Sequence, residues 1–447
     1  MTVRAPTRPV VHIANFEVER QWCRDEHTLP RLSAPADVAV VNRMDEFALL
    51  HAAPDDHVVL KGAPDPDYLS YLDDLGFVLP HRHVVAIQRP GRTVTEDVLD
   101  DRAVLADLTG LAGAGTALAA HGVSDAEEVL AERTGLPLAG PDAATCRAVN
   151  SKVYSRRVAD ELDIRTPPGQ ACETFDDLSA ALDAVVPLLA DGRRFAVKEA
   201  FGVSGTGIAV FGTERRADRL RQLIRRQVDR SGSERVAFVV EEWVANAGDL
   251  NYQFTLASDG VVRFDFVRGQ LTSNGVHKGH RMPARIDGDT DRVLRETASK
   301  LGARLAADGY FGVVGVDGML DPAGGVYPLV EINARNNMST YQQRVLDRFV
   351  SPGRVAMARH YALHPTGPLA FATLHRALGN LLVRRPGDSG LLVTNFATVN
   401  AGLAAAGSGD GANGRLFAVL VADDDRRLDD LDAAVAERLR PWAGGAR

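Results

Sequence analysis

The sequence predicts an α/β protein that folds around several cores. Its length of 447 residues corresponds to roughly three domains at about 150 residues each. Hydrophobic residues make up 45% of the chain and charged residues 25%, ordinary globular values that exclude wholesale disorder. In the first third, short apolar runs alternate with helix-like stretches, which indicates βαβ units and a mostly parallel sheet.

Residues 1–140 are expected to form this parallel-sheet domain. Its predicted strands cover residues 10–13, 38–41, 57–60 and 83–87, and its predicted helices cover residues 46–51, 68–75 and 95–107. No Gly-x-Gly-x-x-Gly motif follows the first strand, so a dinucleotide site there has no support. We expect a domain that is structural or contacts the substrate.

A segment of different character starts near Gly140. A helix is expected over residues 144–161, and Pro167 and Pro168 follow it, where proline cannot continue a helix. The pattern then predicts a helix at 175–189, strands at 194–200 and 207–211, a helix at 216–228, strands at 236–240, 251–256 and 261–267, a helix at 291–308 and a hairpin at 311–333. The end of the chain predicts a separate small α/β unit, with strands at 391–397 and 416–421 and a helix at 428–439.

The net charge and the cysteine content limit the classes of partner and metal site that the sequence predicts. The net charge of −8 argues against nucleic acid as a partner, because a protein that binds nucleic acid needs a basic face. The three cysteines show no Cys-x-x-Cys spacing, which argues against a zinc site or a disulfide framework and favours a reducing, cytoplasmic location. The longest uncharged stretch, residues 108–120, is too short to span a membrane, and no apolar signal region follows Met1.

The hairpin at 311–333 carries the most informative pattern. Turn residues separate two apolar runs, and a three-residue loop at 323–325 places Asp317 opposite Glu331. Opposed carboxylates repel each other, and a divalent cation between them removes the conflict. Asn333 lies on the same face as Glu331, so the three residues form a candidate Mg²⁺ site. The alternative is a hairpin with solvated acids on its outer face.

A glycine-rich loop follows Lys198. Gly202, Gly205 and Gly207 stand between two predicted strands, whereas Walker and dinucleotide loops lead into a helix. A protein-kinase loop precedes its lysine, and the other kinase motifs are absent from the sequence. The remaining interpretation is a β-hairpin flap that covers phosphates while Lys198 supplies charge. The alternative is a plain turn.

The third pattern is a strand end, Glu241, Glu242, Trp243 and Val244, followed by Asp249. A strand that runs into a short connector exposes backbone groups that can bind an adenine edge. An acid a few residues later can hold ribose hydroxyls. Alternatively, Glu241 and Glu242 are a solvated strand end.

Taken in order, these patterns resemble the ATP-grasp superfamily. Its pattern is a lysine on an early helix, a lysine before a glycine flap, a Glu-x-x-Val hinge and a closing Asp and Glu-x-Asn. The matching residues are Lys152, Lys198, Glu241, Val244, Asp317, Glu331 and Asn333, within about residues 136–345. Residues 13–22 look like the pre-ATP-grasp domain of the pheganomycin-type peptide ligases, and residues 390–400 and 414–422 resemble their C-terminal domain.

The resemblance implies a fold and a set of ligands. It implies an ATP-grasp domain at 141–368, with a small lobe at about 150–240 and a large lobe at about 241–368, and a C-terminal α/β domain at 369–447. The implied cofactors are ATP and Mg²⁺ or Mn²⁺, with the metal at the three hairpin residues. The implied nucleotide-binding residues are Lys152, Lys198, Gly202, Ser204, Gly205, Thr206, Gly207, Glu241, Glu242, Trp243, Val244 and Asp249.

The resemblance also implies a reaction. ATP would convert a carboxylate into an acyl phosphate, and an amine, from an amino acid or peptide, would displace phosphate to form an amide, as in specialised peptide biosynthesis. Two other functions stay open: an ATP-grasp kinase that phosphorylates a hydroxyl, and a nucleotide-binding protein without catalysis. A homodimer is a family-level expectation.

Residues 271–283 gather four potentially cationic side chains in five positions. We predict that Arg281 and Arg335 face the acyl phosphate, because arginine can hold two oxygens at once, and these two residues and Lys198 are the candidate catalytic residues. The other three, His277, Lys278 and His280, are candidate substrate contacts. The alternative is a solvated basic turn.

Overall fold

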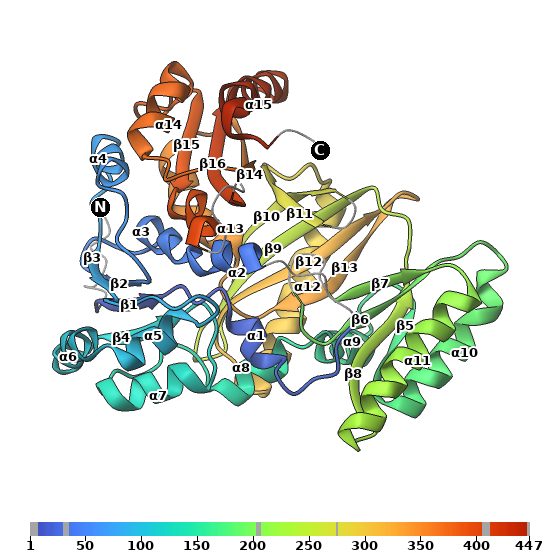
Figure 1. Ribbon diagram of the computed structural model, residues 1–447. Helices are drawn as coiled ribbons and strands as arrows, with labels where there is room; N and C mark the ends of the chain where they lie inside the picture. The colour runs from blue at the N-terminus through green and yellow to red at the C-terminus, as the bar shows by residue number, and fades with distance from the viewer. Residues whose placement is uncertain (1–7, 30–34, 203–206, 274–275, 405–411, 445–447) are drawn as a thin grey trace.

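The computed structural model describes residues 8–29, 35–202, 207–273, 276–404 and 412–444 (Figure 1). These residues form two four-stranded sheets and one eight-stranded sheet, with helices packed against them. In Figure 1 the eight-stranded sheet lies between the N-terminal unit and the four-stranded sheet that α10 and α11 cover. The predicted α/β class is confirmed.

The N-terminal unit contains a fully parallel sheet in the order β3-β2-β1-β4. Its elements are β1 (Val10–Ile13), α1 (Val18–Trp22), α2 (Pro35–Asn42), α3 (Ala48–His51), β2 (His57–Leu60), α4 (Pro66–Asp74), β3 (His81–Val84), α5 (Val94–Asp100), α6 (Arg102–Thr109), β4 (Ala117–Ala120) and α7 (Asp125–Thr134). The chain leaves β1 toward β2 and returns on the other side as β4. The carboxyl ends of β1 and β4 therefore form a topological switch point, where open α/β sheets bind ligands.

One predicted strand of this unit is wrong, and another strand was not predicted. Residues 38–41 lie in helix α2, because Pro35 stands at the first helical position, where its fixed φ and missing N–H are tolerated. The strand preference of the valines is weak, and burial of Val40 in the helix outweighs it. The fourth strand, β4, lies within the uncharged stretch 108–120, which the sequence pattern does not assign.

The small lobe has a sheet in the order β5-β8-β6-β7. Its elements are α8 (Ala143–Val149), α9 (Lys152–Glu161), β5 (Gly169–Thr174), α10 (Phe175–Leu189), β6 (Phe195–Glu199), β7 (Ile208–Phe211), α11 (Glu214–Ser231) and β8 (Arg235–Glu242). The predicted helix 144–161 is in fact two helices, because Ser151 caps the second one by accepting a hydrogen bond from Val153 N at 3.2 Å. This cap places Lys152 at the start of α9.

The eight-stranded sheet has the order β13-β12-β9-β10-β11-β14-β16-β15. Its strands are β9 (Gly248–Leu256), β10 (Val262–Ser273), β11 (Val276–Met282), β12 (Gly312–Asp321), β13 (Gly325–Asn333), β14 (Val355–Leu363), β15 (Gly390–Asn395) and β16 (Gly414–Ala422). Helix α12 (Gly288–Ala307) packs on one face, where Leu294 and Leu301 meet Phe254 and Val316. On the other face, Gln253 and Arg268 contact the start of α13 (Met338–Phe349).

The C-terminal segment 369–447 continues this sheet and forms no separate one within its described residues. Strand β14 pairs along its whole length with β16, and one core joins β14, β15, β16, α14 (Phe371–Leu378) and α15 (Asp425–Leu439). One hydrophobic core therefore extends across the predicted domain boundary at residue 368. Within residues 271–283, which were expected as a loop, residues 271–273 end β10 and residues 276–282 form the whole of β11.

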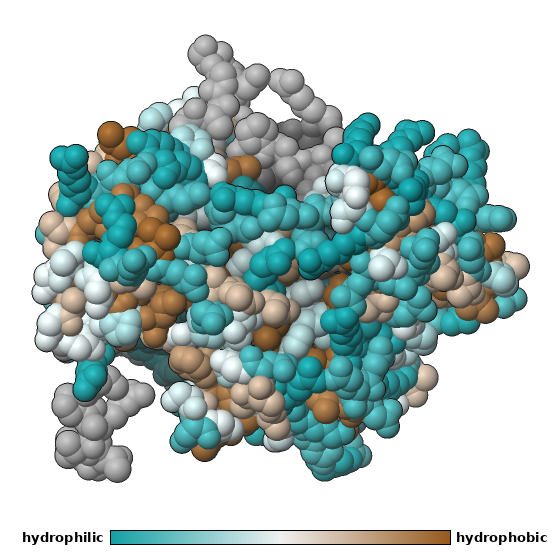
Figure 2. All heavy atoms as spheres, turned by 90° about the horizontal axis from the view of Figure 1, so that it is seen from below, coloured by the Kyte–Doolittle hydropathy of each residue, from teal (hydrophilic) through white to brown (hydrophobic). Residues whose placement is uncertain are grey.

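No helix among the described residues is long and apolar enough to cross a membrane. The face shown in Figure 2 is mostly hydrophilic, and its hydrophobic residues gather in separate small patches. Among the described residues, Cys23, Cys146 and Cys172 form no disulfide bond.

Candidate functional site

The hairpin of β12 and β13 carries the predicted acidic pair. Asp317 and Glu331 are direct partners across the two antiparallel strands. The turn, however, occupies residues 322–324 and not 323–325, with Gly324 at φ +84°. Three-residue hairpin loops commonly end with a glycine in this left-handed region.

Asp317 and Glu331 pair as predicted although the turn is displaced. The reason is that the pairing of β12 with β13 is irregular between Asp317 and Met319. Near the turn, Leu320 pairs with Val326, two positions away from the expected partner Pro328. Proline has no N–H for the ladder, and it is tolerated in a strand where pairing is interrupted. The turn begins one residue earlier than predicted, and the irregularity in the ladder compensates for this difference, so that Asp317 still pairs with Glu331.

Asp317 is partly buried and is held by three amide side chains. Asn251 Nδ2 and Gln270 Nε2 donate to its Oδ1 at 3.0 and 2.6 Å, and Asn333 Nδ2 donates to its Oδ2 at 3.1 Å. Burial and the charge of Glu331 raise the pKa of Asp317 to about 6, although the hydrogen bonds from Asn251 and Gln270 lower it. The site is short of positive charge, which a divalent cation would supply.

The described residues contain no group of three or more His, Cys, Asp or Glu side chains that could hold a metal. Two carboxylates and a carboxamide nevertheless fit Mg²⁺, which usually takes one or two protein carboxylates together with phosphates and water. The raised pKa of Asp317 supports this fit, because a cation beside it would favour the charged carboxylate.

Lys152 connects this hairpin with the small lobe. Its Nζ lies 2.6 Å from Glu331 Oε1 and donates to the carbonyl of Gly202 at 3.0 Å. Lys198 on β6 forms an ion pair with Glu241 on β8, and both side chains are nearly buried. The two predicted phosphate lysines thus both pair with acids in this structure.

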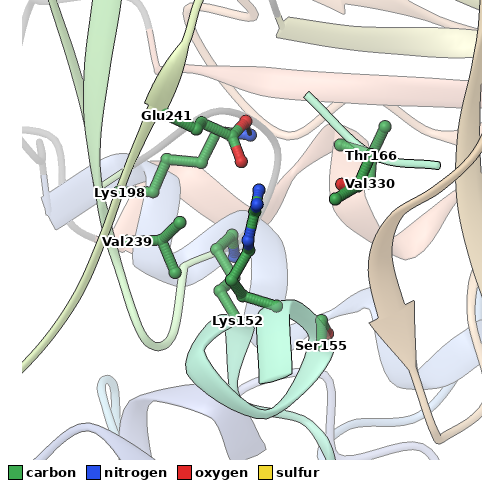
Figure 3. Close-up of a pocket in the computed structure, with 8 residues that line it drawn as sticks. Lys152, Ser155, Thr166, Lys198, Val239, Glu241 and Val330 are labelled. Atoms are coloured by element: carbon green, nitrogen blue, oxygen red, sulfur yellow. Dashed lines mark ion pairs between the residues drawn. The ribbon is translucent and has the colours of Figure 1, made fainter. Parts of the chain in front are cut away.

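Figure 3 shows Lys152, Lys198 and Glu241 around one cavity, with Lys198 and Glu241 pointing toward each other. The cavity is lined by Lys152, Ser155, Arg156, Thr166, Lys198, Val239, Glu241 and Val330. Helix α9, the small-lobe sheet and the hairpin therefore meet at one cavity.

Two of the lining residues on α9 were missed from the sequence. Arg156 follows Lys152 by one helical turn and donates to the carbonyl of Pro167 at 2.5 Å. Ser155 Oγ accepts from the N–H of Ile332 at 3.0 Å and so fixes α9 against β13. The spacing of three and four residues from Lys152, which places side chains on one helix face, is the signal that could have found them.

The amides around Asp317 were missed as well. Asp249, Asn251 and Gln253 alternate along β9, so they share one face of the sheet. This alternation marks a polar face, and it could have indicated Asn251 as a neighbour of the acids.

The predicted adenine hinge is partly occupied by contacts within the protein. The N–H of Glu242 donates to the carbonyl of Pro168 at 2.7 Å, and that of Trp243 donates to the carbonyl of Arg194 at 2.8 Å. The carboxylate of Glu242 pairs with Arg193 through both oxygens. Any adenine contact at the hinge therefore needs other backbone groups.

After the hinge, Val244 is half-buried, and Asp249 begins the polar face of β9. The two carboxylate oxygens of Asp249 accept from Asn246 Nδ2 at 2.5 Å and from Thr272 Oγ1 at 2.6 Å. A carboxylate has about four acceptor positions, so these bonds are compatible with the predicted ribose contact.

The central residues of the predicted flap, Ser204, Gly205 and Thr206, lie outside the described residues. At its ends, Gly202 binds Lys152 through its carbonyl, and Gly207 has φ +75°. A Cβ at Gly207 would lie 2.5 Å from Glu199 Oε2, so this position requires glycine.

Arg335 lies just beyond the hairpin, beside the acids. Its Nη2 donates to Asn333 Oδ1 at 3.0 Å and forms an ion pair with Glu19 of α1. Burial lowers the pKa of Arg335, but the charges of Glu19 and Glu331 outweigh it and raise the pKa above its usual value. The structure thus brings Arg335 to the predicted metal residues.

The structure does not bring Arg281 to the same place. On β11, His280 pairs with Gln270, whose side chain reaches Asp317. Arg281 is the next residue, so its side chain lies on the opposite face, where it forms ion pairs with Asp425 and Asp429 of α15. Arg281 is therefore not carried into the proposed site.

The other predicted substrate contacts have no support either. His280 is buried, and its Nε2 lies 3.0 Å from Ser339 Oγ. Lys278 is exposed to solvent, and the side chain of His277 lies outside the described part of the chain. Neither His280 nor Lys278 lines the cavity between the lobes.

Known proteins resemble the chain in sequence. The family model of the pre ATP-grasp domain matches residues 44–136. The chain is 24% identical over 330 residues, 72% of its own length and 71% of the relative, to the "[Butirosin acyl-carrier protein]--L-glutamate ligase" of Niallia circulans. It is 28% identical over 186 residues, 41% of its length and 44% of the relative, to the formate-dependent phosphoribosylglycinamide formyltransferase of Vibrio parahaemolyticus.

The fold resembles solved structures over nearly the whole chain. A biotin carboxylase from Campylobacter jejuni, in a β,γ-ATP complex, aligns with a TM-score of 0.58 and 14% identity, covering 97% of this chain and 91% of that one. An N5-carboxyaminoimidazole ribonucleotide synthetase in its ADP complex aligns with a TM-score of 0.55 and 12% identity, covering 99% and 100%. The family model thus identifies a pre ATP-grasp domain at residues 44–136, and these alignments show that the chain shares the fold of the two solved structures.

Proposed function

We propose that the protein is an ATP-dependent ligase that joins a carboxylate to an amine and releases ADP and phosphate. The observation that carries the proposal is the opposed pair Asp317 and Glu331, with Lys152 bound to Glu331. Phosphoryl transfer depends on positioning and on neutralising charge. A hairpin that holds two acids beside a buried lysine suits the Mg²⁺ complex of a nucleotide. The ligase relative supports the amide-forming reaction over a kinase.

In this proposal each group of residues has one role. Asp317, Glu331 and Asn333 hold Mg²⁺ or Mn²⁺, which would neutralise phosphate charge. Lys152, Lys198 and the flap residues Gly202 to Gly207 hold the phosphates of ATP. Residues 241–244 bind adenine, Asp249 binds ribose, and Arg335 faces the acyl phosphate.

The reaction proceeds in two steps. A substrate carboxylate oxygen attacks the γ-phosphorus, the bond to ADP breaks, and an acyl phosphate forms. The amine nitrogen then attacks the acyl carbon, and the bond between that carbon and the phosphate oxygen breaks. From its ammonium form the nitrogen loses two protons in total, one leaving with phosphate and one passing to a base.

The relative that is named for an acyl-carrier protein and L-glutamate supports an amino acid or peptide as one substrate. We therefore propose a role in specialised peptide biosynthesis. The resemblance to pheganomycin-type ligases, the homodimer and the cytoplasmic location stay predictions.

The test is incubation of the full chain with ATP, Mg²⁺ and pools of carboxylic acids and amines, with nucleotides followed by chromatography and products by mass spectrometry. We expect ADP release that requires both an acid and an amine, together with a new amide. AMP and pyrophosphate would overturn the mechanism. A phosphorylated hydroxyl compound would identify a kinase instead, and nucleotide binding without turnover of any pool would identify a binding protein.

A further inference from the structure

The N-terminal unit reaches the metal hairpin at the switch point of its own sheet. Helix α1 follows the carboxyl end of β1, and His121 follows the neighbouring end of β4. The carbonyl of His121 accepts a hydrogen bond from Asn336 N at 3.1 Å, three residues after Asn333. The crevice where an open α/β sheet binds ligands therefore faces the end of the proposed catalytic hairpin.

Glu19 on α1 and Arg335 form the ion pair at this junction. Their side chains are 11% and 10% exposed, so both charges are largely removed from bulk water. Burying two charges is costly unless each has good partners. If this ion pair only joined the two units, the free energy lost on removing both charges from water would be a large cost for that role.

Two donors without a partner lie in or near the segment that carries Arg335. Arg335 Nε and Asn337 Nδ2 are buried and have no hydrogen-bond partner among the described residues. The amide of Asn337 approaches Gly315, which pairs with Asn333 on the hairpin. Buried hydrogen-bond donors are rarely left unpaired in folded proteins, so Arg335 Nε and Asn337 Nδ2 indicate a polar ligand at this position.

We propose that Glu19 binds the ammonium group of the amine substrate while Arg335 faces the acyl phosphate. This inference rests on the proposed ligase function. The ion pair uses Oε1 of Glu19, and a carboxylate has further acceptor positions. The guanidinium offers five donors, enough to keep Glu19 in place and still hold acyl-phosphate oxygens. The acceptor half of the site then belongs to the N-terminal unit.

This arrangement also assigns the proton. One ammonium proton first passes to Glu19, which frees the nitrogen lone pair, and this lone pair then attacks the acyl carbon. The second proton leaves with the phosphate when the bond between carbon and phosphate oxygen breaks, and the remaining N–H belongs to the amide. The amine is therefore one that arrives protonated, such as the α-amine of an amino acid or peptide.

The test separates the two half-reactions in Glu19→Gln. Hydroxylamine is neutral near pH 7 and needs no ammonium site, so acyl hydroxamate formation measures the first half alone. We expect hydroxamate formation within twofold of wild type, a KM for the amine raised at least tenfold, and a lower kcat. Glu19→Asp, which keeps the charge, should recover part of the amine affinity.

The matched control is Glu26→Gln. Glu26 lies in the same segment, is 12% exposed and pairs with Arg147 at 2.6 Å, away from the hairpin. We expect its KM for the amine to equal that of wild type. An equal loss of both half-reactions in Glu19→Gln, or an unchanged KM for the amine, would show a purely structural ion pair and overturn the inference. Absence of hydroxamate from the wild-type protein would instead overturn the ligase function.

Discussion

Lys152 Nζ lies 2.6 Å from Glu331 Oε1 and 3.0 Å from the carbonyl of Gly202. One ammonium group therefore links α9, the hairpin of β12 and β13, and Gly202. Because Lys152 is 6% exposed, its charge acts in a medium that screens it less than water does. Lys152 thus balances part of the charge of Glu331 before a nucleotide binds.

Substitution of Lys152 is expected to weaken nucleotide binding. Lys152→Met removes a buried positive charge from the cavity, so the affinity for ADP with Mg²⁺ should fall at least tenfold. Isothermal titration calorimetry measures this change. Lys300→Met, which alters an exposed lysine on α12, should bind as wild type does. Equal affinities in the Lys152 variant and the control would remove Lys152 from the nucleotide site.

The hairpin acids are expected to be required for turnover. Asp317→Asn and Glu331→Gln should each lower ADP release by roughly two orders of magnitude or more, since a metal ion supplies several kcal/mol of charge stabilisation. Chelation of Mg²⁺ should abolish turnover in the wild type. Asp321→Asn, near the turn of the same hairpin and paired with Arg165, should remain active. Near-wild-type rates in either acid variant would contradict the metal assignment.

Arg281→Ala is expected to leave catalysis unchanged, because its side chain pairs with Asp425 and Asp429 on the far face of the sheet. These contacts are partly exposed, so their loss should cost at most about 1 kcal/mol of unfolding free energy. Steady-state kinetics and urea denaturation report the two effects separately. A large loss of kcat with normal stability would return Arg281 to the site.

Glu46 gives a pH dependence of stability. Burial raises its pKa from 4.5 to about 7, although the backbone N–H groups of Ala397 and Phe396 lower it. Between these two values the unfolded chain releases a proton that the folded protein keeps. The free energy of unfolding should therefore fall as the pH rises from about 4.5 to 7, by about 3 kcal/mol from this group.

Glu46→Gln removes this titration, so urea denaturation at several pH values should show a smaller fall over the same range. Part of the fall should remain, because burial also raises the pKa of Glu17 to about 7. Identical pH profiles for the variant and the wild type would contradict the shifted pKa of Glu46.

The pairing of Asp317 with Glu331 was predicted correctly because both strands lie within one short stretch of sequence, but an irregularity in the ladder had to offset the misplaced turn. The amides that hold Asp317 were not, since Asn251 and Gln270 are 66 and 47 residues away in the chain. Their positions depend on the order of strands in the sheet, which tertiary packing decides. The same applies to the contact between Arg335 and Glu19, which are 316 residues apart.

The prediction for Arg281 shows a second limit of sequence patterns. A cluster of basic residues looks alike whether it lies in a loop or in a strand. Because residues 276–282 form β11, neighbouring side chains point to opposite faces, and only one face carries the proposed chemistry. Recognising β11 required its partners β10 and β14, which local propensity does not specify.

The pairing of β14 with β16 constrains how this protein can be shortened or recombined. Every residue of β14 from Val355 to Leu363 has a partner on β16. A chain cut at residue 368 would expose this buried strand as a long open edge, and such edges recruit strands from other molecules. We expect that truncated protein to aggregate, which would show in size-exclusion chromatography. Exchange of C-terminal segments between related enzymes therefore has to preserve this strand pairing before it can change specificity.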